Sequence, residues 1–145
     1  MSIESICSRQ VDQVEPDETA QAAGQRMNTR SVGTLIVVDS EERPIGILTD
    51  RDLALRVVGE GRDPAATRVK DVMTPKPRTV TEKTPIEDAL SRMRSLGVRR
   101  LPVVGSRGEI VGIVSLDDIL VLLTQELREV GRLLDSTSPR SLLKL

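Results

Sequence analysis

The chain of 145 residues contains no phenylalanine, tyrosine, tryptophan or histidine, and only one cysteine. Without aromatic side chains it lacks the stacking platforms on which proteins hold single-stranded bases. Without histidine it lacks the commonest general acid and base and the imidazole ligands of metal sites. Cys7 cannot form a disulfide within the chain, and we interpret it as a small apolar residue, with a reactive or interchain thiol as the alternative. We therefore expect neither a catalytic centre nor a metal site.

Charge and hydropathy have no extreme either. Lysine and arginine number 21 against 22 aspartates and glutamates, so the net charge of −1 gives no general attraction for nucleic acid or an anionic membrane. No apolar run approaches the roughly 18 residues of a membrane span, and the acidic N-terminal segment lacks a signal-peptide pattern. We expect a cytoplasmic protein with no membrane partner. A nucleic-acid patch is a minor alternative, made of Arg92, Arg94, Arg99 and Arg100.

The sequence does contain an internal repeat. Residues 46–52 (GILTDRD) recur as residues 112–118 (GIVSLDD), 66 positions later. The same offset, without a gap, aligns Val14 with Val80, Arg26 with Arg92, Met27 with Met93, and Leu35 with Leu101. Each half alone would be marginally stable, since chains of about 60 residues bury only about 60% of their unfolded surface. Two halves related by a pseudo-twofold axis are therefore expected.

Each copy has the pattern of a β-α-β-β-α unit. A short strand (about 10–14 and 78–81) precedes a helix, whose N-cap candidates are Asp17 and Thr84, with Pro85 suited to the first helical position. The apolar residues of the second copy's helix follow a helical period at Ile86, Ala89, Leu90, Met93 and Leu96. Two strands joined by a turn come next, at 35–38 and 45–48, then at 101–104 and 110–114. A second helix closes each copy, at 50–58 and at 116–123.

These elements divide the chain into three parts. Repeat 1 covers residues 1–66, with a polar connector from about residue 59 to residue 70, and repeat 2 covers residues 67–123. Residues 124–145 form a helical tail with no counterpart in repeat 1. Its apolar residues keep helical spacing until residues 136–139 (STSP) stop it, and they are Leu127, Val130, Leu133 and Leu134. This stripe extends the last helix either against the core or against a partner chain.

A polar motif recurs where a strand passes into the second helix, as Thr49-x-x-Asp52 and Ser115-x-x-Asp118. A hydroxyl there lies beside the unpaired N–H groups of the first turn, which favour an anion such as phosphate. An acidic residue one turn later can accept two hydrogen bonds from the diol of a ribose. The same spacing is also that of a capping box, in which both side chains bond only to the backbone. Both interpretations stand, because a duplication copies caps as readily as binding sites.

Together these features resemble a CBS-domain pair, also called a Bateman module. The resemblance covers about residues 3–123 and is carried by the β-α-β-β-α order, the two motifs above, VGTLIVV (32–38), VRRLPVV (98–104) and DVMTPKPRTVTEKTPIEDAL (71–90). It implies an α+β fold in which two tandem repeats pack through their sheets with pseudo-twofold symmetry. It also implies two clefts between the repeats that bind adenosyl ligands such as AMP, ADP, ATP or S-adenosylmethionine.

The resemblance also implies roles for individual residues. Thr49 and Ser115 would contact phosphate, while Asp52 and Asp118 would hold the ribose hydroxyls. Residues that enter the first helix of the opposite copy would line the clefts. Those residues are Asp17 to Thr19 and Thr81 to Thr84.

The two copies differ in charge. Arg99 and Arg100 precede the strand of copy two, where phosphate-binding members of the family often carry His or Arg, whereas copy one has Gly33-Thr34. Guanidinium groups bind phosphate through charge-assisted hydrogen bonds, so the Ser115/Asp118 cleft is predicted to prefer the more phosphorylated ligand. The Thr49/Asp52 cleft has Arg51 as its one obvious cation and is predicted to be weak or empty. The alternative for Arg99 and Arg100 is a solvated pair of charges.

The hypothesis that follows is a regulatory sensor and not an enzyme. It requires no cofactor, binds an adenine nucleotide or S-adenosylmethionine as its regulatory ligand, forms a disc-like homodimer and signals occupancy to an unidentified protein target. The alternative is a dimerisation or scaffold protein that keeps the same fold but has no physiological nucleotide ligand.

Overall fold

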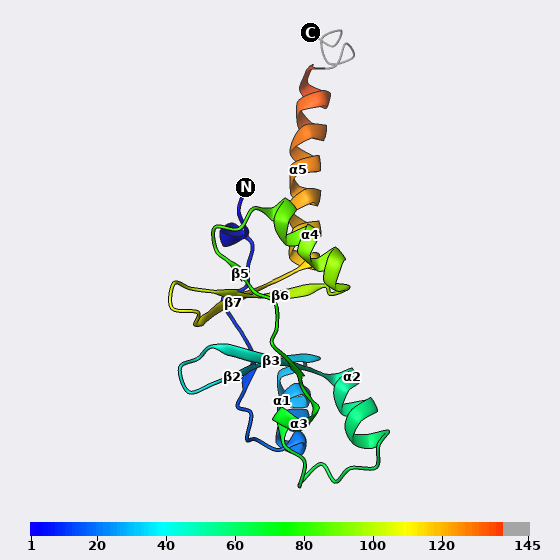
Figure 1. Cartoon of the computed structure of the whole chain (residues 1–145). Helices are drawn as coiled ribbons and strands as arrows, with labels where there is room; N and C mark the ends of the chain where they lie inside the picture. The colour runs from blue at the N-terminus through cyan, green and yellow to red at the C-terminus, as the bar shows by residue number, and fades with distance from the viewer. Residues whose placement is uncertain (138–145) are drawn as a thin grey trace.

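Two small sheets, one from each repeat, lie at the centre of the computed structural model, which describes residues 1–137 (Figure 1). The first sheet has the order β1-β2-β3-β4, with strands Gln13–Val14, Thr34–Val38, Pro44–Thr49 and Thr74–Pro75. The second has the order β5-β6-β7, with strands Val80–Thr81, Arg100–Val104 and Ile110–Ser115. In both sheets the first strand is parallel to the second, and the second and third strands form an antiparallel hairpin.

Helices complete the predicted β-α-β-β-α order in each repeat. The first helices are α1 (Ala20–Arg30) and α4 (Ile86–Leu96). The second helix of repeat 1 begins as α2 (Asp50–Asp52) and continues with π-helical hydrogen bonding as η2 (Leu53–Val58), whereas that of repeat 2 is the single helix α5 (Leu116–Thr137). Two short helices stand outside this pattern, namely η1 (Ile3–Ser5) and α3 (Val69–Val72). The α+β fold of two tandem repeats is thus confirmed.

The helix caps differ from those predicted. Thr19 and not Asp17 caps α1, because the Thr19 hydroxyl oxygen accepts a hydrogen bond from the N–H of Ala22 at 3.1 Å. The N-cap of α4 is Pro85, with no side-chain cap, while the Thr84 hydroxyl oxygen accepts from the N–H of Thr81 at 3.0 Å. The Asp17 carboxylate and the Thr84 hydroxyl, which were predicted to cap these helices, accept hydrogen bonds from Lys70 and Thr81 instead. The helices themselves begin within a few residues of the predicted positions.

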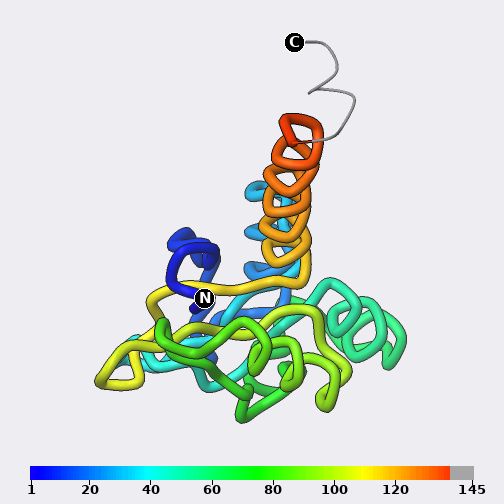
Figure 2. The backbone as a smooth tube through the Cα atoms, turned by 90° about the horizontal axis from the view of Figure 1, so that it is seen from above, coloured from blue at the N-terminus to red at the C-terminus, as the bar shows by residue number. Residues whose placement is uncertain are grey.

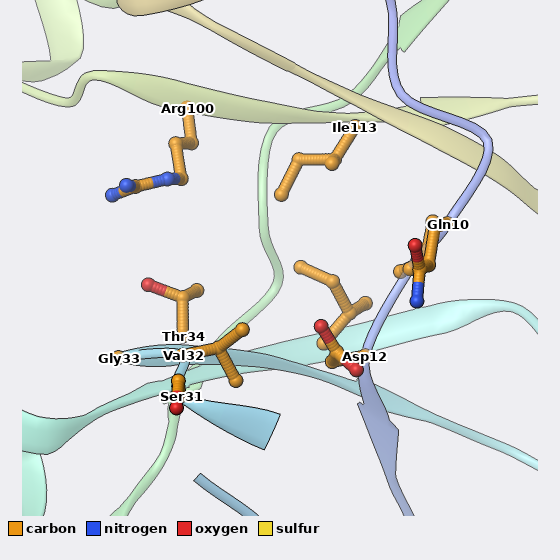
Figure 3. Close-up of a pocket in the computed structure, with 10 residues that line it drawn as sticks. Gln10, Asp12, Ser31, Val32, Gly33, Thr34, Arg100 and Ile113 are labelled. Atoms are coloured by element: carbon orange, nitrogen blue, oxygen red, sulfur yellow. The ribbon is translucent and has the colours of Figure 1, made fainter.

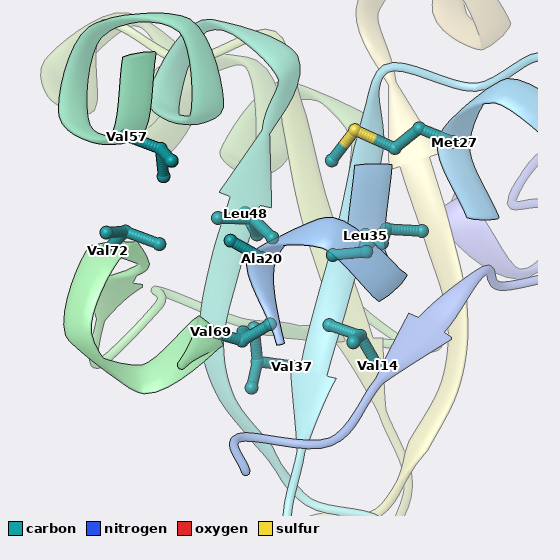
Figure 4. Packing of buried hydrophobic residues seen from close by; sticks show 10 residues of the cluster. Val14, Ala20, Met27, Leu35, Val37, Leu48, Val57, Val69 and Val72 are labelled. Atoms are coloured by element: carbon teal, nitrogen blue, oxygen red, sulfur yellow. The ribbon is translucent and has the colours of Figure 1, made fainter. Parts of the chain in front are cut away.

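Strand alternation explains how one strand serves two cores. In β2, Leu35 and Val37 point into the core of repeat 1, where Figure 4 shows them among the other buried residues of that core. Ile36 and Val38 point to the other face, where they pack with Ile110 of the second sheet. Because all of these side chains are at most 7% exposed, the sheets face each other across a buried apolar seam. The predicted packing of the repeats through their sheets is confirmed.

The first segment of each repeat, with η1 in repeat 1 and α3 in repeat 2, packs on the other repeat. Val69 and Val72 of α3 belong to the core of repeat 1, and Ile3 of η1 belongs to the core of repeat 2; all three are fully buried. Ser8 pairs with Ile113 of β7, just as Thr74 of β4 pairs with Ile47 of β3. These pairs are related by the same 66-residue offset as the sequence repeat. The last two residues of the predicted polar connector therefore begin the helix α3, and β4 follows it as the fourth strand of the first sheet.

The tail extends α5 as a continuous helix of 22 residues that projects from the second repeat, as Figures 1 and 2 show from two directions. Leu127, Val130, Leu133 and Leu134 are between 52% and 70% exposed. The alternative in which the stripe extends the core is therefore wrong. The predicted stop at residues 136–139 is wrong for its first half, because α5 continues through Ser136 to Thr137. Residues 138 and 139, and the rest of the tail to residue 145, lie outside the described residues. Within residues 1–137, no helix is both long enough and apolar enough to cross a membrane.

Candidate functional site

Both Thr/Ser-x-x-Asp motifs form a reciprocal pair of hydrogen bonds. Thr49 Oγ1 accepts from the N–H of Asp52 at 3.1 Å, and Asp52 Oδ2 accepts from the N–H of Thr49 at 2.9 Å. Ser115 and Asp118 repeat the arrangement where β7 passes into α5, at 3.1 and 3.0 Å. This geometry is that of a capping box, one of the two interpretations of the sequence motif. Each motif therefore fixes the place where a helix begins.

The N–H groups of the first turn after Thr49 already have partners within the protein. The N–H of Asp50 donates to the carbonyl oxygen of Gly33 at 2.9 Å, and the N–H of Arg51 donates to Asp50 Oδ1 at 2.8 Å. The N–H of Asp52 is taken by Thr49. The expectation of unpaired donors at this helix start is therefore wrong. An anion bound here would be held by side chains.

A cavity of about 600 Å³ lies between the two repeats beside Thr49, and we call it the Thr49 cavity. Repeat 1 contributes residues from β2, β3 and the start of α2, while repeat 2 contributes the loop before β6 and parts of β6 and β7. The lining residues are Gly33, Thr34, Ile36, Ile47, Thr49, Asp50, Arg51, Gly97, Val98, Arg99, Arg100, Pro102 and Ile113. The cavity combines an aliphatic surface with hydroxyl and charged groups, and both repeats are needed to form it.

Two smaller cavities share Arg100 with the Thr49 cavity, and the one beside Ser115 is lined by repeat 2 alone. The Ser115 cavity, of about 160 Å³, is lined by Arg99, Arg100, Ser115, Leu116 and Asp117. A third cavity, of about 280 Å³, is lined by residues 10–12, 31–34, Ile36, Arg100 and Ile113. Figure 3 shows Arg100 and Ile113 reaching into it from the second sheet, opposite Thr34 and Asp12. Arg100 borders all three cavities.

The positions of Arg99 and Arg100 correct the predicted inequality of the two clefts. In the antiparallel register of β6 and β7, Arg100 lies opposite Ser115, so it borders the Ser115 cavity as expected. Both arginines also line the larger Thr49 cavity, together with Arg51. The prediction that Arg51 is the one obvious cation near Thr49 is therefore wrong. Three arginines line the larger cavity, and two line the smaller one.

Two carboxylates that sequence reasoning missed moderate this positive charge. Asp50 lines the Thr49 cavity, and Asp117 lines the Ser115 cavity, where its Oδ1 lies 3.7 Å from Arg99 Nη2. Both side chains of that ion pair are 71% exposed, so the pair holds Arg99 only weakly. Asp50 and Asp117 lie at neighbouring places in the two copies and not at the same one, because the 66-residue offset aligns Asp50 with Leu116 and Asp117 with Arg51. The repeat therefore gave no signal for either carboxylate.

The predicted ribose carboxylates lie behind the cavity surfaces. Neither Asp52 nor Asp118 is among the residues that line the Thr49 or the Ser115 cavity. The Asp52 side chain is 15% exposed, and its Oδ1 lies 3.8 Å from Arg56 Nε. Both carboxylates are bonded to the backbone N–H of their own motif.

The other predicted cleft residues lie away from these cavities. None of the three linings includes Asp17, Thr19, Thr81 or Thr84. Asp17 Oδ1 accepts from Lys70 Nζ at 2.9 Å, and this hydrogen bond lowers the pKa of the Asp17 carboxyl. Thr19 is committed to capping α1, and the hydroxyls of Thr81 and Thr84 lie 3.3 Å apart. Their proposed contact with a ligand has no counterpart in the three cavities.

Among residues 1–137 no group of three or more acidic or cysteine side chains could hold a metal ion.

Two β-α-β-β-α units that face each other across a seam, with a ligand-sized cavity between them, define the class of this protein. The family model of the CBS domain matches residues 3–59 and again residues 69–125. The chain therefore belongs to the CBS-domain family and carries two copies of the domain.

Two curated relatives and one solved structure illustrate the likeness. The uncharacterized protein MK0525 of Methanopyrus kandleri is 35% identical over 120 residues, which are 83% of this chain and 61% of that protein. The CBS domain-containing protein YhcV of Bacillus subtilis is 38% identical over 120 residues, 83% of this chain and 84% of YhcV. The chain thus spans a little under two thirds of the first relative and most of the second.

The structure of the CBS domain pair of protein MJ0100, in complex with 5′-methylthioadenosine and S-adenosyl-L-methionine, superposes with a TM-score of 0.76. It covers 87% of this chain and 98% of its own, at 21% identity, so the likeness is one of fold.

Proposed function

We propose that this protein is a regulatory module that binds an adenosyl ligand, such as AMP, ADP, ATP or S-adenosylmethionine, in the Thr49 cavity. One observation carries the proposal, namely a cavity of about 600 Å³ that both repeats line and in which three arginines meet an aliphatic surface. Ligand pockets generally have volumes of roughly 300 to 1,000 Å³ and are mainly apolar with a few placed polar groups. The adenosyl compounds bound by the pair from MJ0100 support the ligand class.

The lining suggests how such a ligand would lie. Ile36, Ile47 and Ile113, from the two facing sheets, offer an aliphatic surface to the adenine ring. The Thr49 hydroxyl accepts a hydrogen bond from the backbone and keeps its proton to donate to a ligand oxygen. Arg51, on the first turn after Thr49, lies at the polar part of the lining, where phosphate oxygens would find cationic partners. Arg99 and Arg100 add two further guanidinium groups, which favour the more phosphorylated ligands.

Regulation would follow from the position of the cavity. A ligand that touches both repeats stabilises the arrangement of the repeats that it fits best, by no more than its difference in affinity for the two arrangements. We propose that a protein partner reads this change, and that the chain acts as a homodimer without catalysing a reaction. We also propose a cytoplasmic site of action.

Isothermal titration calorimetry with AMP, ADP, ATP, NAD and S-adenosylmethionine tests the proposal. Arg100→Gln removes a cation from the cavity, whereas Arg107→Gln, the matched control, removes one from a side chain that is 87% exposed on a distant turn. A hydrogen bond to a charged group contributes about 1.5 to 3 kcal/mol, so Arg100→Gln should weaken ATP binding roughly 10- to 100-fold. Arg107→Gln should leave it unchanged. No heat of binding for any of the five ligands at millimolar concentration would reject the proposal.

The scaffold alternative rests on a different observation. Both predicted ribose carboxylates, Asp52 and Asp118, are hydrogen-bonded within capping boxes, which is sufficient to explain why the chain has them. A scaffold would purify without nucleotide, and its melting temperature would not rise when nucleotide is added. A ligand that binds the folded state raises that temperature by mass action, so a thermal-shift series in ATP separates the two functions.

A further inference from the structure

Helix α5 continues well beyond the second CBS domain, whose family match ends at residue 125. Along it, apolar residues follow one another at alternating steps of four and three positions. These residues, which we call the α5 stripe, are Leu116, Leu120, Leu123, Leu127, Val130 and Leu134. From Leu120 to Leu134 the four steps cover 14 residues, an average of 3.5, which is the heptad period of a coiled coil.

Nothing in residues 1–137 covers the outer part of this stripe. Leu120, Leu123, Leu127, Val130 and Leu134 are between 48% and 70% exposed, whereas Ile119, on the side that faces the sheet, is fully buried. Figures 1 and 2 both show the helix leading away from the rest of the fold. An isolated helix shorter than roughly 12 to 15 residues is marginal in water, and residues 124–137 include Gly131. The projecting part therefore needs a partner to be stable.

The pattern selects another helix as that partner. A helix that packs on a globular core usually has a wide apolar stripe, whereas a narrow stripe at the a and d positions of a heptad is the pattern of helices that supercoil around one another. The positions beside the stripe carry little charge. With Leu120, Leu127 and Leu134 at heptad position a, the flanking residues from 119 onward are Ile119, Thr124, Glu126, Gly131 and Leu133.

The charges instead occupy the side of the helix away from the stripe. Arg132 and Glu129 form an ion pair there, with an Nη1–Oε1 distance of 2.7 Å. In a parallel pair of identical helices, Glu126 would lie opposite Gly131 of the other helix, so no like charges meet. A second copy of this chain presents the same stripe, of the same length and with the same uncharged flanks.

We propose that the α5 stripe pairs with the α5 stripe of a second copy of this chain in a coiled coil. The exposed part of the stripe, from Leu120 to Leu134, spans 15 residues, or about 22 Å at 1.5 Å per residue, and supplies two heptads to the pair. The inference deepens the homodimer of the proposed function by naming its contact surface, and it rests on that part of the proposal alone. It does not depend on the nucleotide site.

Sedimentation equilibrium of the full chain without ligand, from about 1 to 100 µM, tests the pairing. Leu127→Glu places a charge at the centre of the stripe, and Gln125→Glu adds the same charge on the opposite side of the helix. We expect the wild-type protein and Gln125→Glu to associate with dissociation constants within about threefold of each other, and Leu127→Glu to associate at least 100-fold more weakly. A wild-type monomer at 100 µM, or equal association of all three proteins, would overturn the inference.

Disulfide cross-linking gives a second measurement that does not rely on a disruptive variant. In a Cys7→Ser background, Leu127→Cys lies near the twofold axis of a helix pair and should form an intermolecular disulfide under mild oxidation. Gln125→Cys should not. Equal cross-linking at both positions, or none at position 127, would contradict the pairing. Nucleotide calorimetry on the same samples bears only on the ligand site, so the failure of one proposal is distinguishable from the failure of the other.

Discussion

The third residue of the chain is predicted to be among the most important for its stability. Ile3 is fully buried in the core of repeat 2, although it belongs by sequence to repeat 1. Its N–H donates to the carbonyl oxygen of Thr84 at 3.1 Å, and the next N–H, of Glu4, donates to that of Glu82 at 3.2 Å. Ile3→Ala keeps these backbone bonds and removes only the outer carbons of the side chain. The substitution therefore isolates what the apolar packing of η1 contributes to the stability of repeat 2.

The magnitude follows from the atoms removed. Three buried carbons, at about 0.8 kcal/mol each, give roughly 2.4 kcal/mol of lost transfer free energy. The cavity left behind adds roughly 1 kcal/mol, so the free energy of unfolding should fall by about 3 to 4 kcal/mol. For a chain of this length the melting temperature should fall by roughly 10 °C. The control is Val58→Ala, whose side chain is 79% exposed and whose removal should change stability by less than about 0.5 kcal/mol.

Far-ultraviolet circular dichroism in urea is the appropriate assay, because the chain has no aromatic residue for fluorescence. A single transition with an unchanged slope and a lower midpoint is the expected result for Ile3→Ala. A loss of less than about 1 kcal/mol would refute the reasoning, since it would mean that the N-terminal segment contributes little to the core of repeat 2.

Three further predictions concern individual side chains. Thr49→Ala and Ser115→Ala each remove the hydroxyl of a capping box and should each lower the free energy of unfolding by about 1 kcal/mol, measured by urea unfolding. The hydrogen bond from Arg26 lowers the pKa of Glu18, so this carboxylate stabilises the fold above its unfolded-state value near 4.5 and loses that effect as the pH falls through its lower folded value. Glu18→Gln should therefore flatten the fall in melting temperature between neutral and acid pH. Burial raises the pKa of the Cys7 thiol, so iodoacetamide at pH 8 should alkylate the folded protein more slowly than the protein in urea.

Each of these predictions has a clear contrary result. A serine variant, Thr49→Ser, retains the capping oxygen and should restore most of the lost stability; failure to do so would contradict the capping role. An unchanged pH profile in Glu18→Gln would mean that the ion pair with Arg26 adds nothing to folding. Equal alkylation rates in the folded and unfolded states would show that Cys7 is as accessible as in a free chain.

The repeated strands and helices could be predicted because their signals are local. Strands β2, β3, β6 and β7 begin and end within one residue of the predicted ranges. Their apolar runs are bounded by turn residues, and each run recurs in the other copy at an offset of 66 residues, which supports the same prediction twice. The caps could not be predicted as well, because Asp17 is held by Lys70, a residue 53 positions away that no local pattern reveals.

Only part of the candidate site could be predicted from the sequence. Thr49, Arg51, Arg99 and Arg100 all border one cavity, yet the sequence assigned the last two to the other cleft alone. An antiparallel register places Arg100 beside Ser115, and this can be read from one hairpin. Its approach to Thr49 depends on how two hairpins face each other across the seam. That arrangement is tertiary and leaves no mark on the spacing of either copy.

The packing of η1 on repeat 2 and of α3 on repeat 1 has a consequence for synthesis on the ribosome. Ile3 leaves the exit tunnel well before Leu101, Val114 and Ile119, the members of its core that are made about a hundred residues later. At about 5 to 20 residues per second, this apolar segment waits roughly 5 to 20 seconds for its partners. Repeat 1 meets a shorter delay, because Val69 and Val72 follow it directly along the chain. The first half of the protein can therefore complete its own core while the N-terminal segment is still waiting to complete the second.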